Sequence, residues 1–184
     1  IGAHLISYQK NGGTIGLGCE LKETAKTNLT ANLPIPTEAI DPRWFYNRKD
    51  KGTEDLLSRL DLKKVGSLDV LDITTLQTKE TQNLFDTFGI ARRLQPKIVI
   101  AYAPASTLQN NNIQKFNSFL DYLRYDNLRH PDKRKYFVSS VLINSRQQGS
   151  CVSKTLTLIV GIREDIARPI GIKSDQAIRY LLPK

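Results

Sequence analysis

A carboxylate stands between a predicted strand and a predicted helix near the start of the chain. Residues 14–19 form a short glycine-rich run, Glu20 follows it directly, and a helix is predicted from about Glu23 to Leu33. A strand that ends in an acid and leads into a helix is half of a nucleotide-binding crossover, in which the acid accepts hydrogen bonds from a ribose. Acids at strand ends are common, so this pattern alone identifies no particular cofactor.

Other residues suited to catalysis are few. The 184-residue chain has two cysteines, Cys19 and Cys151, and two histidines, His4 and His130, at widely separated positions. They form neither a disulfide framework nor a C-x-x-C metal pair, so we expect no metal site and a reducing, intracellular compartment. Lys154 lies near Cys151 and could lower the pKa of its thiol, but we favour a structural or incidental cysteine.

The net charge of +9 favours an anionic partner, with nucleic acid as the first candidate. Because the charges are dispersed, a basic surface that is merely solvated explains the excess equally well. Two basic clusters and Lys154 are the predicted nucleic-acid contacts. The denser one comprises Arg129, Lys133, Arg134 and Lys135, and the second comprises Arg43, Arg48 and Lys49.

Three aromatic residues, Trp44, Phe45 and Tyr46, lie inside the second cluster. Aromatic rings beside arginines can stack on bases, but they more often anchor a loop to the core, and we favour that interpretation. No apolar run approaches the length of a bilayer span, so we expect no membrane partner.

The predicted elements alternate along the chain. Strands are predicted at 14–19, 67–71, 98–101, 136–143 and 156–162, helices at 2–11, 23–33, 84–94, 113–123 and 174–182, and an irregular insertion at 34–55. This order predicts a single doubly wound α/β domain, mostly parallel, with an antiparallel last pair of strands. The strand at 98–101 is expected to be buried on both faces. Its carboxyl end, Tyr102-Ala103-Pro104, offers no acid, amide or cation.

Several segments together resemble the DNA cytosine-5 methyltransferase family. They are Ile1-Gly-Ala3, Gly16-Leu-Gly-Cys-Glu20, Gln95-Pro-Lys-Ile-Val-Ile100, the helix around Phe116–Leu123, and Leu156-Thr-Leu-Ile-Val-Gly-Ile-Arg163. The resemblance runs from Ile1 to about Pro183 and implies a Rossmann-like methyltransferase fold. It also implies that residues 1–184 are one catalytic-domain core without the family's first strand, target-recognition domain and closing helix. The chain contains no methionine, so we expect a fragment, a processed product or an incomplete chain.

The family's catalytic positions are replaced in this sequence. The nucleophilic cysteine falls at Leu76 or Gln77, and the Glu-Asn-Val that handles the cytosine ring falls on Tyr102-Ala103-Pro104. Of the family's Gln-x-Arg-x-Arg stretch, Lys154 keeps one cation. A thiolate must add to the ring for this methylation, so the resemblance implies a protein without its own catalytic residues.

Cofactor binding is less clearly lost. The family binds S-adenosylmethionine, and the resemblance leaves Gly2 of its glycine loop and Glu20 as the ribose acid. Without the strand that precedes the glycine loop the site is half built, so we expect that no cofactor is required.

Three functions remain open. The first is an inactive methyltransferase-like subunit that binds nucleic acid, DNA rather than RNA, and a protein partner that supplies missing elements. The second is part of an active methyltransferase that is split between chains or given incompletely. The third is a basic structural subunit of a ribonucleoprotein complex. Activity, partner chains and a comparison of DNA with RNA distinguish them.

Overall fold

The computed structural model describes residues 8–15, 18–20, 23–32, 37–39, 68–74, 91, 94–108, 112–125, 135–147, 151 and 153–183. The chain divides into two compact units, Ile1–Lys64 and Val65–Lys184. Within the described residues, no helix combines the length and the apolar character that a membrane span needs.

The first unit contains a strand, a helix and a second strand. Strand β1 (Gly18–Glu20) leads into α2 (Glu23–Asn32), and β2 (Thr37–Ala39) returns parallel to β1, with Glu20 opposite Ala39. The predicted strand, acid and helix are therefore confirmed, although β1 begins later than expected. The prediction of irregular structure at 37–39 is wrong. Pro34 and Pro36 stand just before these residues and suggested an interruption of regular structure. Proline is nevertheless compatible with the first residues of a strand.

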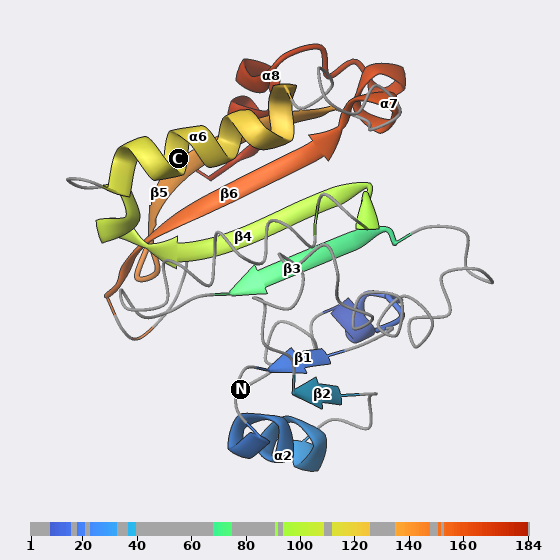
Figure 1. The fold of residues 1–184 in the computed structure, drawn as a ribbon, viewed down its shortest axis with the longest axis vertical. Coiled ribbons are helices and arrows are strands. Elements are labelled where there is room, and N and C mark those ends of the chain that lie inside the picture. Colours follow the sequence, from blue (N-terminus) through green and yellow to red (C-terminus); the bar gives the residue numbers. More distant parts are fainter. Residues whose placement is uncertain are drawn as a thin grey trace, which may run out of the picture. The chain divides into compact units, whose positions relative to one another are not determined.

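The second unit is built on a four-stranded sheet. Its strands are β3 (Val70–Thr74), β4 (Ile98–Pro104), β5 (Tyr136–Asn144) and β6 (Thr155–Arg163). They lie in the order β3-β4-β6-β5, as Figure 1 shows. Strands β3 and β4 are parallel, whereas β6 is antiparallel to both β4 and β5. Strands β3, β4 and β5 therefore run in one direction, and the last strand inserts between β4 and β5.

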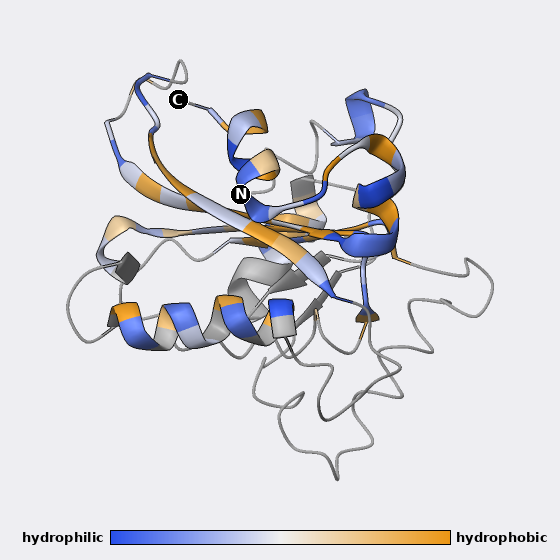
Figure 2. Ribbon diagram, turned by 90° about the horizontal axis from the view of Figure 1, so that it is seen from above, coloured by the Kyte–Doolittle hydropathy of each residue, from blue (hydrophilic) through white to orange (hydrophobic). Residues whose placement is uncertain are grey.

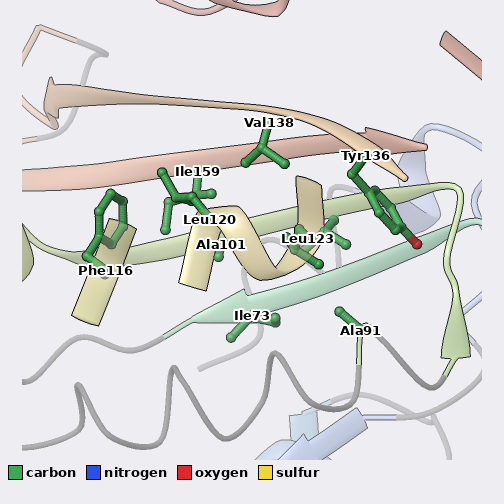
Figure 3. Packing of buried hydrophobic residues seen from close by; sticks show 11 residues of the cluster. Ile73, Ala91, Ala101, Phe116, Leu120, Leu123, Tyr136, Val138 and Ile159 are labelled. Atoms are coloured by element: carbon green, nitrogen blue, oxygen red, sulfur yellow. The ribbon is translucent and has the colours of Figure 1, made fainter. Parts of the chain in front are cut away.

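One face of this sheet packs against α6 (Asn112–Tyr125). Apolar side chains repeat along α6 at the spacing of one helical face, and they meet alternate residues of the strands (Figure 3). The buried residues are Phe116, Leu120 and Leu123 from the helix, with Ile73, Val99, Ala101, Ala103, Tyr136, Val138 and Ile159 from the sheet. The Tyr136 hydroxyl donates a 2.6 Å hydrogen bond to the Pro96 carbonyl, which satisfies the polar end of this buried ring.

The opposite face is covered over β5 and β6 by the C-terminal elements. These are α7 (Glu164–Ala167), η5 (Arg168–Ile170) and α8 (Asp175–Leu181). Ala167, Ile172 and Ile178 pack there with Phe137, Val160 and Ile162. Figure 2 shows α6 on one side of the sheet and the C-terminal helices on the other, so the unit has three layers. The Ser174 hydroxyl accepts a hydrogen bond from Ala177 N–H and caps α8, as predicted.

Strand β4 is not buried on both faces, and that prediction is wrong. Val99, Ala101 and Ala103 are buried, but Ile98, Ile100, Tyr102 and Pro104 alternate with them and are half-buried. A short apolar run shows that a strand is central without showing that both faces are sealed. Strand β3 also lies three residues later than predicted, so it ends at Thr74.

Candidate functional site at the carboxyl end of the sheet

The candidate site lies where several strand ends meet. Because β3, β4 and β5 run in the same direction, their carboxyl ends share one edge of the sheet. Ligands of open α/β sheets gather at this edge. Thr74 lies opposite Tyr102 on adjacent strands, and β4 continues through Pro104 into η3 (Ala105–Leu108). The turn between β5 and β6 lies at the same edge.

Tyr102 is the polar side chain that β4 contributes near its end. It is half-buried and lies on the face opposite α6, as do Asp72 and Thr74 on β3. Burial raises the pKa of the Tyr102 phenol, and the nearby Asp72 carboxylate raises it further. The phenol therefore stays protonated near neutral pH. Thr74 Oγ1 donates a 3.4 Å hydrogen bond to Asp72 Oδ1, so the three residues form one polar group.

The other two residues at this strand end offer little chemistry. Ala103 is fully buried against α6, and Pro104 has no N–H to donate. Thr157 lies opposite Ala103 on β6 and is fully buried, and its hydroxyl has no hydrogen-bond partner among the described residues. No carboxylate or amide side chain stands at Tyr102–Pro104, the positions where the resemblance places the family's acid and amide. Leu76 and Gln77, the predicted replacements of the nucleophile, lie outside the described residues.

The β5–β6 turn is tied by hydrogen bonds. Ser145 N–H donates to the Lys154 carbonyl at 2.8 Å, and Lys154 N–H donates to Ser145 Oγ at 2.9 Å. Asn144 Oδ1 accepts from Arg146 N–H and from the Ser153 hydroxyl, which links the two arms. Arg146 and Lys154 are exposed, and neither forms an ion pair with a described residue. The turn thus presents two cations beside the strand ends.

The predicted nucleic-acid contacts do not form one patch in the described residues. Lys135 precedes β5 and Lys154 precedes β6, so they lie at opposite ends of the hairpin, about 30 Å apart for strands of this length. The remaining predicted residues lie outside the described ones; they are Arg43, Arg48, Lys49, Arg129, Lys133 and Arg134. Arg146 was missed, although the sequence holds a signal: no Asp or Glu occurs between Lys133 and Arg163.

The first unit supplies one position that fits a cofactor. Glu20 is the last residue of β1, a parallel strand followed by a helix, which is where a ribose-binding acid stands in such crossovers. Gly2 lies outside the described residues. Among the residues that the structure describes, no group of histidine, cysteine or acidic side chains could hold a metal ion. Cys151 is exposed and unbridged.

Comparison with solved structures finds methyltransferases. A protein described as a DNA modification methyltransferase, encoded within an E. coli prophage, matches with a TM-score of 0.63 and 14% identity over 84% of this chain. The Dnmt2 methyltransferase of S. pombe matches with a TM-score of 0.59 and 9% identity over 88%. This chain spans 42% and 45% of those two chains, so it corresponds to less than half of each.

No protein-family model matches the sequence, and the comparison with curated proteins gives no significant match either. At such low identities the structural likeness establishes the fold alone. The strand order, with a reversed last strand inserted beside β4, is consistent with the Rossmann-like fold predicted from the sequence. The chain is therefore a mixed α/β protein with the fold of methyltransferases.

Proposed function

We propose that this chain is a subunit related to DNA cytosine-5 methyltransferases that binds nucleic acid and a protein partner and does not itself transfer a methyl group. The observation that carries the proposal is the end of β4. A protonated phenol, a buried methyl group and a proline occupy Tyr102, Ala103 and Pro104.

Cytosine-5 methylation needs a thiolate that adds to the ring and an acid that stabilises the ring during addition. The sequence from Thr74 to Thr78 contains no cysteine. Tyr102 can donate a hydrogen bond, but its raised pKa makes it a poor acid for a ring nitrogen. Both halves of the reaction therefore lack their usual groups, which supports a function in binding.

The β5–β6 turn supports nucleic-acid binding. Arg146 and Lys154 are exposed, unneutralised by described residues, and held on a hydrogen-bonded hairpin. Such cations contact phosphates, and each contact that is lost lowers the slope of log affinity against log salt by about 0.9 on duplex DNA.

Fluorescence anisotropy with a labelled duplex, and with an RNA of the same sequence under one salt condition, tests this proposal. We expect salt-dependent binding that favours DNA, and a smaller salt slope for Arg146→Ala and Lys154→Ala. Lys97→Ala is the matched control, because Asp69 already pairs with Lys97 at 2.6 Å and this pair lies at the opposite end of β4. No binding, or equal slopes for all three variants, contradicts the proposal, and a preference for RNA favours a ribonucleoprotein subunit.

S-adenosylmethionine is not required for this binding function. When the cofactor binds, Glu20 is the residue whose position fits a ribose contact. Isothermal titration of the full chain with S-adenosylmethionine, alongside Glu20→Gln, measures that contact directly. We expect the duplex affinity to be the same with and without the cofactor.

A second candidate is one part of an active methyltransferase. The fraction of each neighbour's chain that this chain spans favours it, because a methyltransferase of that length contains more sequence than these residues. A second chain that restores methyl transfer when mixed with this one supports the candidate. The intact mass of the natural protein, compared with the 20.8 kDa of this chain, decides whether further sequence belongs to it.

A further inference from the structure

Strand β5 forms one edge of the described sheet, with β6 as its neighbour (Figure 1). The hydrogen bonds at the two ends of the β5–β6 hairpin show which residues of β5 bond to β6. Glu164 N–H donates to the Lys135 carbonyl, and Ser145 N–H donates to the Lys154 carbonyl. Odd-numbered residues of β5 therefore bond to β6, and even-numbered residues direct their N–H and C=O groups outward.

The amino-terminal half of this outer edge is closed by side chains. Val138 N–H donates to Asp175 Oδ1 at 2.8 Å, and the Val138 carbonyl accepts from Arg124 at 3.1 Å. The Ser140 carbonyl accepts from Arg179. Helix α6 supplies Arg124 and helix α8 supplies the other two, so the helices on both faces reach around the strand. Proteins commonly cover edge strands in such ways, which prevents unwanted pairing.

The edge is open at Leu142. Its outward N–H and C=O have no partner among the described residues, and the side chain is 52% exposed. The next outward residue is Asn144, whose carbonyl accepts from Gln147 N–H. Leu142 thus combines main-chain groups that no described residue pairs with and an exposed apolar side chain, which is the combination that an added strand uses.

The charge around this open segment indicates the chemistry of the added strand. Arg146 and Lys154 lie just beyond Asn144 and are exposed. No acidic residue occurs between Lys133 and Arg163, and so none lies on either strand of the hairpin. An acidic segment would be attracted here, and a basic one would be repelled.

We propose that the edge of β5 around Leu142 receives an extended acidic segment of a protein partner, which adds to the sheet as a strand. Main-chain hydrogen bonds to Leu142 set the register, an apolar residue of the partner contacts the Leu142 side chain, and its carboxylates pair with Arg146 and Lys154. The proposal identifies the docking surface for the partner named in the proposed function. The partner's carboxylates take the same two cations that the proposed function gives to phosphates, so the peptide and nucleic acid are measured separately.

A synthetic peptide of alternating glutamate and valine tests the proposal with the full chain. Nuclear magnetic resonance reports peptide affinity and hydrogen exchange of the Leu142 amide. We expect slower exchange at Leu142 when the peptide is bound. A peptide with the same side chains but an N-methylated central residue loses one hydrogen bond and should bind about fivefold more weakly.

Matched variants separate the edge from general charge effects. Leu142→Glu should weaken peptide binding at least about tenfold, since it adds repulsion and removes the apolar contact. Ile113→Glu is the control, because Ile113 is a similarly exposed apolar residue on α6, 44% exposed. Equal binding of the two variants, or of the two peptides, overturns the proposal.

Two other occupants give distinct results. Protection of the Leu142 amide by a short oligonucleotide, with none by the peptide, assigns the edge of β5 to nucleic acid and overturns the proposal. A protected Leu142 amide in the free protein, together with a dimeric mass by sedimentation, assigns the edge to a second copy and also overturns it.

Discussion

Removal of the Asp175 side chain should destabilise the protein more than its position near the surface suggests. Asp175 Oδ2 lies 2.6 Å from Arg124 Nε, an ion pair whose geometry is not that of an aligned hydrogen bond. Its other oxygen accepts from Val138 N–H at 2.8 Å on the edge of β5. Asp175→Ala therefore removes one of the two described carboxylates that pair with Arg124 and leaves the Val138 main-chain N–H without its acceptor.

The magnitude follows from these two contacts. A hydrogen bond to a charged group contributes about 1.5–3 kcal/mol, and the 38% exposure of Asp175 favours the lower end. A partly exposed ion pair adds about 0.5 kcal/mol. The sum is about 2 kcal/mol, which corresponds to a melting temperature lowered by about 5 °C in a protein of this size.

Urea unfolding followed by circular dichroism measures the change, with the midpoint and slope fitted together. Asp121→Ala is the matched control. Asp121 pairs with the same Arg124 at 3.2 Å but is 54% exposed and accepts from no main-chain donor among the described residues, so its removal should cost less than about 0.5 kcal/mol. Equal losses for the two variants would refute the assigned role of the β5 edge. Asp175→Asn should recover part of the loss, because its amide oxygen can still accept from Val138.

Three further predictions concern single side chains. The pKa of Tyr102 is raised by burial and by Asp72, so its folded state holds the proton more tightly than the unfolded chain. This difference in pKa contributes fully to the free energy of unfolding below the pKa of tyrosine in the unfolded chain, about 10. The contribution is lost as the pH rises through the pKa of Tyr102 in the folded protein. Tyr102→Phe should abolish that alkaline loss in urea titrations, and an unchanged pH profile would contradict it. Tyr136→Phe should cost about 1–2 kcal/mol, because the buried carbonyl of Pro96 loses its donor, and a neutral result argues against that bond. Thr157→Val should stabilise the protein by about 1 kcal/mol in thermal unfolding, since it replaces a buried hydroxyl that has no partner in the described part of the chain by a methyl group; destabilisation would show that the hydroxyl is satisfied.

Elements with a strong local pattern were predictable from the sequence. Helix α6 carries Phe116, Leu120 and Leu123 at helical spacing, and strands β5 and β6 were located within one residue at each end. The Ser174 cap of α8 was also predicted, because a capping serine followed by a periodic apolar stretch is a local signal.

Long-range arrangement was not predictable in the same way. Insertion of β6 between β4 and β5 depends on pairings such as Ile98 with Ile162, which no local pattern encodes. The contacts of Arg124 and Asp175 with each other and with the edge of β5 join residues that are distant in sequence. Short elements such as β2 and α7 have too few residues to show a period.

The candidate site was predictable in its position and only partly in its composition. The end of β4 at Tyr102–Pro104 was identified from the sequence, because a buried strand directs attention to its carboxyl end. The group of Asp72, Thr74 and Tyr102 was not, since it depends on the parallel register of β3 and β4. Arg146 was overlooked because it is an isolated cation, and its significance comes from the lack of acids on the surrounding hairpin.

The most direct measurement of the proposed function is methyl transfer from radiolabelled S-adenosylmethionine to duplex DNA by the full chain. The end of β4, with its protonated Tyr102 and buried Ala103, predicts that incorporation stays at the level of a no-protein control while the same preparation binds the duplex. Incorporation above that level, at carbon 5 of cytosine and proportional to protein concentration, would contradict the account and identify an active enzyme.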